Sequence, residues 1–281
     1  MCNLPNLLKQ LLEGARCFLL SIAILIQTNN TERVVGGRDI PKGEFVPYQV
    51  SLQYYMSTKN YKHYCGGSII SKNLVLTAAH CCDGLQVERM SVRAGVRDLS
   101  ENQGKRYAVA FYQIHPNYKE FESSDIAIIK IINNFDLNNI SMAAIDVFSA
   151  KRIAGNVEVT LTGWGLRLPI QLPIFQSQLQ NLNFPTVLQT MSYSTISDRE
   201  CRNKGIDRLS KTEICAQGFL LKGACVGDSG GPLVRYEGNR LQQVGVVSYG
   251  FFVCGVFDVP DVYTRVSEFS DWLQQNIARN S

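Results

Sequence analysis

The segment GACVGDSGGP, residues 223–232, places Ser229 between Asp228 and two glycines, shortly after Cys225. An aspartate in such an apolar, glycine-rich stretch is costly to bury unless its charge is paired. The flanking glycines leave the backbone free to turn sharply. The segment is therefore suited to presenting a turn and a hydroxyl group, and the partners of both must lie elsewhere in the chain.

Length and composition limit the class of protein to which this segment can belong. The chain has 281 residues, of which 45% are hydrophobic, which is enough for one large or two smaller domains with a buried core. The net charge is only +4, and the sequence has no run of lysine or arginine, so we expect neither nucleic-acid nor membrane-surface binding. Nine cysteines without CxxC spacing or a histidine cluster favour disulfides over a zinc site. We expect no metal and no cofactor.

The N-terminus contains an apolar run, FLLSIAILI, at residues 18–26, preceded by Lys9 and Arg16. The run is shorter than the about 20 helical residues that cross a bilayer, which is typical of a secretory signal peptide. We therefore predict a signal peptide over about residues 1–27 and a secreted, extracellular protein. A short membrane anchor or a misassigned start methionine is the alternative.

A basic residue, Arg33, follows a polar segment and directly precedes VVGG at residues 34–37. A basic residue in a flexible, exposed segment is typical of a proteolytic processing site. We predict an activation peptide over residues 28–33 and a mature chain that begins at Val34 and spans residues 34–281.

The mature chain is dominated by short alternating or β-branched runs between turn-rich segments, a pattern typical of an all-β protein. We expect two β units that divide near residues 148–156, and a long surface loop over residues 166–187. The runs lie at residues 48–55, 66–79, 90–95, 107–115, 125–131, 157–165, 188–196, 231–236, 242–250 and 261–266.

A helical pattern closes the chain at residues 267–280, with Ser267 as the expected N-cap. One face of this segment carries the apolar side chains Phe269, Trp272, Leu273 and Ile277.

A serine hydroxyl becomes a nucleophile when a base takes its proton and another group orients that base. His80, in LTAAHCC, follows an apolar strand-like run and lies beside a cysteine, so it is the candidate base for Ser229. His63 lies in a segment rich in lysine and tyrosine, and His115 in a turn, so both are expected to be structural. Asp125 precedes a continuous apolar run and would be drawn inside, where it needs a partner. Capping a turn is the alternative role for Asp125.

Five motifs occur in the order VVGG, LTAAHC, DIAIIK, GDSGGP and VSYG. Together they resemble the chymotrypsin/trypsin-like serine proteases over residues 34–281. The resemblance implies two antiparallel six-stranded β-barrels packed around a cleft, with a C-terminal α-helix. It also implies a monomeric serine endopeptidase that is made as a zymogen, acts on proteins or peptides, and has an activating protease and protein inhibitors as partners. The alternative is a catalytically dead homologue that serves as a binding or cofactor module.

The resemblance assigns a role to each candidate catalytic residue. Ser229 would be the nucleophile, His80 the general base and then acid, and Asp125 the group that fixes the tautomer of His80. The N–H groups of Gly227 and Ser229 would form the oxyanion hole. All three triad residues are present, which argues against the catalytically dead alternative.

Activation and substrate pairing follow from the same resemblance. Once the bond after Arg33 is cut, the new ammonium of Val34 would pair with Asp228 and order the oxyanion hole. The segment of Ser248, Tyr249 and Gly250 resembles the strand that pairs with the substrate backbone. Tyr249 stands where the family usually has tryptophan. Because Val96 replaces the glutamate of calcium-binding relatives, we expect no calcium site.

The resemblance implies three disulfides, Cys65–Cys81, Cys201–Cys215 and Cys225–Cys254. Cys82 is then the odd cysteine of the mature chain, which suggests a free thiol or an intermolecular bond. Cys82 could instead take the place of Cys81. No cysteine lies between Asn30 and Val34, so the activation peptide should be released rather than tethered.

The expected specificity pocket departs from the family pattern. Trypsin-like members carry an aspartate on the pocket floor, where this chain has Gly223 followed by Ala224. Asp261 stands where the family usually has glycine and should enter the pocket from the side, while Gly250 keeps the entrance open. The combination is similar to that of crustacean collagenolytic serine proteases, so we expect cleavage after large apolar or aromatic residues and also after Arg or Lys. In the alternative, Asp261 pairs with a neighbour and leaves a chymotrypsin-like pocket.

Overall fold

The computed structural model describes residues 37–56, 60–138, 140–148, 152–166, 184–218, 223–250, 254 and 259–280. The predicted signal peptide, the activation peptide and Val34 lie outside these residues, as does most of the expected loop at residues 166–187. Among the helices that the structure describes, none combines the length and the apolar character that a membrane crossing requires.

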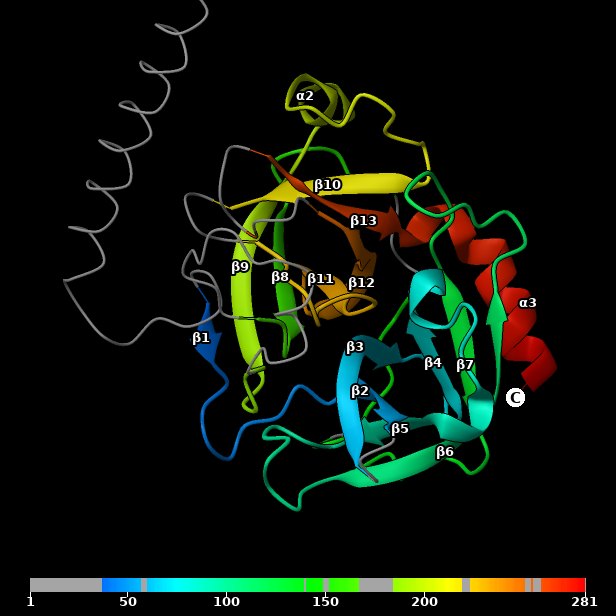
Figure 1. The fold of residues 1–281 in the computed structure, drawn as a ribbon. Coiled ribbons are helices and arrows are strands. Elements are labelled where there is room, and N and C mark those ends of the chain that lie inside the picture. Colours follow the sequence, from blue (N-terminus) through cyan, green and yellow to red (C-terminus); the bar gives the residue numbers. More distant parts are fainter. Residues whose placement is uncertain are drawn as a thin grey trace, which may run out of the picture. The chain divides into compact units, whose positions relative to one another are not determined.

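Six antiparallel strands form a closed barrel in the first half of the chain, in the order β2-β3-β4-β7-β6-β5 (Figure 1). Strand β4, of sequence LVLT, is buried along its whole length and pairs with β7. The bounds are β2 (Gln49–Tyr55), β3 (Tyr61–Ile69), β4 (Leu74–Thr77), β5 (Met90–Ala94), β6 (Lys105–Ile114) and β7 (Ala127–Ile131).

The second half of the chain forms a sheet in the order β9-β10-β13-β12-β11-β8, which the pairing of β8 with β9 closes into another six-stranded barrel. A short strand, β1 (Arg38–Asp39), adds to the edge of β9. The bounds are β8 (Glu158–Gly163), β9 (Gln189–Ile196), β10 (Glu213–Gln217), β11 (Pro232–Glu237), β12 (Arg240–Tyr249) and β13 (Asp261–Arg265). The expected all-β fold of two six-stranded barrels is confirmed.

Buried polar contacts join the two barrels. The Ser68 hydroxyl donates to Gln243 Oε1 at 2.6 Å, and the Thr162 hydroxyl donates to Gln49 Oε1 at 2.7 Å. All four residues are buried, so each amide is paired across the interface rather than left unsatisfied. These bonds fix how the loops of one barrel face those of the other.

The C-terminal helix α3 (Ser270–Asn280) packs against the first barrel, beside β7 in Figure 1. Its expected apolar face is confirmed, because Leu273 is fully buried and Trp272 and Ile277 pack on the same core. The expected N-cap is wrong. A 3-10 turn, η4 (Val266–Phe269), comes first, and the buried Ser267 hydroxyl has no hydrogen-bond partner among the described residues.

Strand β10 and helix α2 are among the elements that were not predicted from the sequence. Strand β10 begins with Glu213, and a charged residue at this position does not indicate a buried strand. In the structure Glu213 is nevertheless buried. Helix α2 (Asp198–Asn203) is a short helix capped by Ser197, whose hydroxyl accepts from the Glu200 N–H at 3.2 Å. The Cys201–Cys215 disulfide joins this helix to β10.

Candidate active site

Strand pairing brings His80 and Asp125 together. His80 lies in the 3-10 turn η1 (Ala79–Cys81) just after β4, and Asp125 directly precedes β7. Thr77 of β4 pairs with Ala127 of β7, so the two flanking segments leave the barrel side by side. His80 Nδ1 lies 2.8 Å from Asp125 Oδ2, and the His80 backbone N–H donates to Asp125 Oδ1 at 3.0 Å. The carboxylate therefore fixes both the ring and the backbone of His80.

Two residues of the second barrel also hold Asp125. The Ser248 hydroxyl donates to Asp125 Oδ2 at 2.6 Å, and the Thr264 hydroxyl donates to the Asp125 carbonyl oxygen at 2.6 Å. Burial alone would raise the pKa of Asp125, but hydrogen bonds from His80 and Ser248 and the charge of His80 hold the pKa below its ordinary value. Asp125 is thus a buried carboxylate that stays ionised. The roles of Thr264 and of the Ser248 hydroxyl were not predicted from the sequence.

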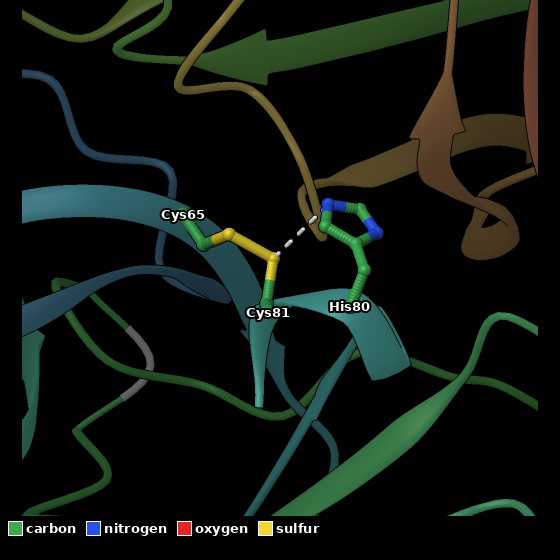
Figure 2. Close-up of side chains that lie close together, drawn as sticks. All are labelled: Cys65, His80 and Cys81. Atoms are coloured by element: carbon green, nitrogen blue, oxygen red, sulfur yellow. Dashed lines mark hydrogen bonds between the residues drawn. A yellow bond between two sulfur atoms is a disulfide. The ribbon is translucent and has the colours of Figure 1, made fainter. Parts of the chain in front are cut away.

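The orientation of His80 leaves one ring nitrogen for proton transfer. Because Nδ1 donates to a carboxylate, the unprotonated nitrogen of the neutral ring is Nε2. Figure 2 shows this ring beside the Cys65–Cys81 disulfide, with Nε2 at 3.6 Å from Cys81 Sγ. The three side chains are close enough to surround an ion, but two sulfurs joined to each other offer no thiolate ligand. The group does not fit a metal site.

The turn that carries Ser229 is packed against the first barrel. The Ser229 carbonyl oxygen accepts from the Gly66 N–H at 2.7 Å, and the Gly230 N–H donates to the Val247 carbonyl at 2.8 Å. Gly230 has φ +73°, and a Cβ on it would overlap the Thr77 hydroxyl oxygen. A glycine is therefore required here for both the backbone conformation and the space. The contact brings the Ser229 turn to Thr77, three residues before His80.

Asp228 is buried beside a pair of glycines. Its Oδ1 accepts from the Gly165 N–H at 2.8 Å and its Oδ2 from the Cys225 N–H at 3.0 Å. A Cβ on Gly163 or Gly165 would overlap the carboxylate. Burial raises the pKa of Asp228 to about 6, although the two backbone hydrogen bonds lower it. No ion pair of Asp228 forms within the described residues, and its expected partner Val34 lies outside them.

His63 is a hydrogen-bonded structural residue, as expected, but its position next to the loop before Ser229 was not predicted. His63 lies on β3, where its Nδ1 is 2.9 Å from the Ser51 hydroxyl oxygen and its Nε2 is 2.9 Å from the Gly227 carbonyl oxygen. Since a carbonyl can only accept, Nε2 carries the proton and Ser51 donates to Nδ1. Burial lowers the pKa of His63 to about 4, so the ring is neutral at pH 7. The strand at His63 was not predicted, because Lys62 and the neighbouring tyrosines suggested an exposed segment.

The expected pocket residues converge on Asp261. Its Oδ2 accepts from the Ala224 N–H at 2.7 Å, directly after the buried Gly223. A Cβ on Gly250 would lie 2.9 Å from Asp261 Oδ1, so the carboxylate reaches from the floor segment to Gly250. Burial raises the pKa of Asp261 to about 7; the Ala224 hydrogen bond lowers it and the charge of Asp228 raises it further. The half-buried Tyr249 precedes Gly250 at the end of β12.

The structure forms the three disulfides Cys65–Cys81, Cys201–Cys215 and Cys225–Cys254. Cys82 is free and fully buried, and burial raises the pKa of its thiol well above its ordinary value. The alternative pairing of Cys82 with Cys65 is not formed. The position of Val96 is also buried, and its side chain offers no ligand atom for calcium.

Comparison with known sequences places most of the described region in one family. The family model described as Trypsin matches residues 34–273. The chain is 36% identical to Chymotrypsin-2 of Vespa crabro, over 86% of this chain and 99% of that protein. It is 35% identical to Trypsin-1 of Astacus astacus, over 86% and 99% of the two chains, and 33% identical to Chymotrypsin-C of Bos taurus, over 91% and 92%.

Proposed function

Because the chain belongs to the trypsin family and is a serine endopeptidase, we propose that it uses Ser229, His80 and Asp125 as its catalytic triad. The observation that carries this proposal is the double contact of Asp125 with the His80 ring and backbone. A carboxylate that holds Nδ1 at 2.8 Å presents Nε2 as a base and stabilises the imidazolium that proton transfer creates.

The proposed reaction proceeds in two acyl-transfer steps. Ser229 Oγ attacks the peptide carbonyl carbon while His80 Nε2 takes the hydroxyl proton, and the carbonyl oxygen becomes an oxyanion that the N–H groups of Gly227 and Ser229 receive. His80 then gives its proton to the leaving amine, and water releases the acyl group by the reverse sequence of proton transfers. The hydrogen bonds of the Gly227 and Ser229 carbonyls to His63 and Gly66 support this role, because each restrains the peptide that directly follows a donor residue.

The protein is further proposed to be a zymogen cut after Arg33 by an activating protease. The support is the state of Asp228, whose carboxylate is buried with only backbone N–H partners and has its pKa raised to about 6. The ammonium of Val34 would compensate this charge and hold the 225–229 turn in place. Asp228→Asn should therefore abolish the gain of activity on cleavage while Ser229 stays in place.

The pocket is proposed to accept both large apolar and basic side chains. Gly223 gives the floor no charge, and the Asp261 carboxylate lies to one side, between Ala224 and Gly250. A carboxylate beside the pocket can pair with a long cation, whereas an apolar side chain can occupy the uncharged floor without facing an ion directly. Asp261→Gly should abolish cleavage after Arg and Lys and leave cleavage after Leu, Phe and Tyr.

Secretion is also proposed, from the disulfides and the N-terminal apolar run. Three disulfides are typical of proteins that fold in an oxidising compartment, and the apolar run at residues 18–26 would direct the chain there. The mature part, residues 34–281, would then meet protein substrates and protein inhibitors outside the cell.

A serine-directed fluorophosphonate probe tests the proposal. We expect the chain cleaved after Arg33 to be labelled and the uncleaved chain to be labelled weakly, with Ser229→Ala as the unreactive control. Equal labelling of the cut and uncut forms would exclude the zymogen. Absence of labelling after cleavage would favour the catalytically dead homologue.

A further inference from the structure

The connection that follows β7 contains a sequence element that the proposed protease mechanism does not use. Residues 139–141 read Asn-Ile-Ser, and no other Asn-x-Ser/Thr triplet occurs among residues 34–281. In a protein that enters the secretory route, such a triplet is an acceptor for an N-linked glycan when its central residue is not proline. A second triplet, Asn29-Asn30-Thr31, precedes the predicted cleavage site. The mature chain would therefore keep one acceptor, Asn139.

The residues on both sides of Asn139 are at the surface. Asn139 itself lies outside the described residues, whereas Asn138 is exposed and the side chain of Ile140 is 73% exposed. Asn138 Oδ1 accepts from the N–H groups of Ile140 and Ser141, at 2.9 Å each, so the flanking residues form a tight polar turn. A bulky, solvated group attached beside these exposed residues would displace no packed side chain.

Packing places this turn at the end of the first barrel that lies away from the proposed catalytic residues. Met142 is buried, and a Cβ on Gly95, directly after β5, would lie 3.3 Å from the Met142 side chain and 3.5 Å from Ser141 Oγ. Because β5 and β7 both pair antiparallel with β6, they run in the same direction and finish at the same end of the barrel. Asp125 precedes the opposite end of β7, and the five residues of that strand span about 16 Å. A glycan on this turn would leave the proposed active site open.

Apolar side chains are exposed on the same connection. Ile132 is 63% exposed, Leu137 is 41% exposed and Ile140 is 73% exposed. Large apolar groups that are exposed close together in the chain favour association with other molecules unless something covers them. An oligosaccharide on Asn139 would be attached directly beside Ile140 and two residues from Leu137.

We propose that Asn139 carries an N-linked glycan, which shields the exposed apolar side chains at the end of the first barrel opposite the catalytic residues. The inference rests on the proposed secretion, which brings the acceptor to a lipid diphosphate-linked oligosaccharide. In the transfer, the Asn139 side-chain nitrogen forms a bond to C1 of the first sugar. The bond from C1 to the diphosphate oxygen breaks, the lipid diphosphate leaves, and the amide nitrogen gives one proton to the transferring enzyme.

The test uses the full-length chain, expressed in eukaryotic secretory cells and collected from the medium. All variants carry Asn29→Gln, so that Asn139 is the acceptor that remains. Peptide N-glycosidase should increase the electrophoretic mobility of the protein and convert Asn139 to aspartate, which peptide mapping by mass spectrometry locates. Asn139→Gln and Ser141→Ala should each abolish the shift, whereas Ser141→Thr should keep it, because threonine completes the same triplet. Asn133→Gln is the matched control, since Asn133 lies in the same connection but in no triplet, and it should keep the shift.

Activity and association measure what the glycan does. Asn139→Gln should leave kcat/KM on a short peptide unchanged, because the turn and Asp125 lie at opposite ends of β7. The same variant should aggregate at a lower concentration than the glycosylated protein, measured by light scattering. Adding Ile140→Ser to Asn139→Gln should restore the native threshold, because it removes the most exposed apolar side chain of the connection.

The outcomes separate this inference from the proposed function. A secreted chain that peptide N-glycosidase leaves unchanged, or a shift that persists in Asn139→Gln, would overturn the inference and leave secretion intact. Equal aggregation of the glycosylated protein and Asn139→Gln would overturn the shielding role. A chain that stays inside the cell without a glycan would overturn secretion and the inference together, while fluorophosphonate labelling reports on the protease activity in every case.

Discussion

The Nε2–H of His63 donates to the carbonyl oxygen of Gly227 at 2.9 Å, which joins β3 of the first barrel to the loop that precedes Ser229. Gly227 has φ +99°, so its peptide is held in an orientation that few other residues could keep. The same residue carries one of the two proposed oxyanion donors. A histidine in the first barrel therefore constrains the backbone geometry of a loop in the second.

We expect His63→Phe to lower both stability and activity. The substitution leaves the buried Gly227 carbonyl and the Ser51 hydroxyl without partners, which costs about 1 to 3 kcal/mol for each unsatisfied group. Chemical denaturation measures the first effect, and kcat on a fixed peptide the second. Because the pKa of His63 is lowered to about 4, protonation opposes folding, so the stability that His63 contributes should fall as the pH drops from about 6.5, its unfolded pKa, towards 4. Unchanged kcat in a folded His63→Phe variant would contradict the role of this bond in ordering the loop.

Ser248→Ala should reduce catalysis through Asp125. It removes a 2.6 Å hydrogen bond to the buried carboxylate, and bonds to charged groups contribute about 1.5 to 3 kcal/mol, which corresponds to a loss in kcat of about tenfold or more. Thr264→Val is the matched control, since it removes a bond of equal length to the Asp125 backbone carbonyl and leaves the carboxylate untouched. We expect the control to affect unfolding more than kcat. A larger loss of kcat in Thr264→Val would show that the carboxylate contact is unimportant.

Cleavage preference should depend on pH. Burial raises the pKa of Asp261 to about 7, so the group is mainly neutral at pH 6 and mainly ionised at pH 8. The ratio of cleavage after Arg to cleavage after Phe should therefore rise over this interval, measured with two peptides that differ only at the residue before the cleaved bond. Asp261→Asn should flatten the ratio. The same rise in that variant would assign the effect to another group, with Asp228, whose charge raises the pKa of Asp261, as the first candidate.

Gly230→Ala should disable the enzyme, because a Cβ there would overlap the Thr77 hydroxyl and lie 2.7 Å from the Gly66 carbonyl oxygen. Gly238→Ala is a control for backbone conformation alone, since Gly238 also has a positive φ, +60°, but its Cβ would meet nothing within 4 Å. We expect the control to cost about 1 kcal/mol in stability and no activity. Fluorophosphonate labelling and thermal unfolding of both variants provide the comparison. Comparable activity in the two variants would show that the Gly230 contact does not position Ser229.

The sequence could predict the parts of the site that lie in contiguous motifs. The apolar runs of β4 and β7 were recognisable, and His80 and Asp125 flank them, so their approach follows from pairing of the two strands. The predicted division of the chain near residues 148–156 falls in the connection between β7 and β8, where part of the chain lies outside the described residues.

The missed features depend on contacts between distant segments. His63 and Glu213 look like solvent-facing residues in their local sequence, but the folded barrels bury Glu213 and half-bury His63. The position of Ser267 before an apolar helical pattern was correct for an N-cap, but the chain enters α3 through a 3-10 turn and the helix begins three residues later. The local pattern cannot distinguish such a turn from the first turn of a helix, because η4 follows β13 directly and also buries apolar side chains, Val266 and Phe269.

The two hydroxyl groups that hold Asp125, from Ser248 and Thr264, lie in the last 34 residues of the chain. During synthesis the first barrel is complete long before these residues leave the ribosome, and until then the aspartate has His80 as a partner but lacks both donors of the second barrel. The full set of hydrogen bonds to Asp125 therefore forms only when nearly the whole polypeptide has been made and the barrels have docked. The hydrogen bonds to the carboxylate of the proposed triad are thus completed late in synthesis, independently of any processing at Arg33.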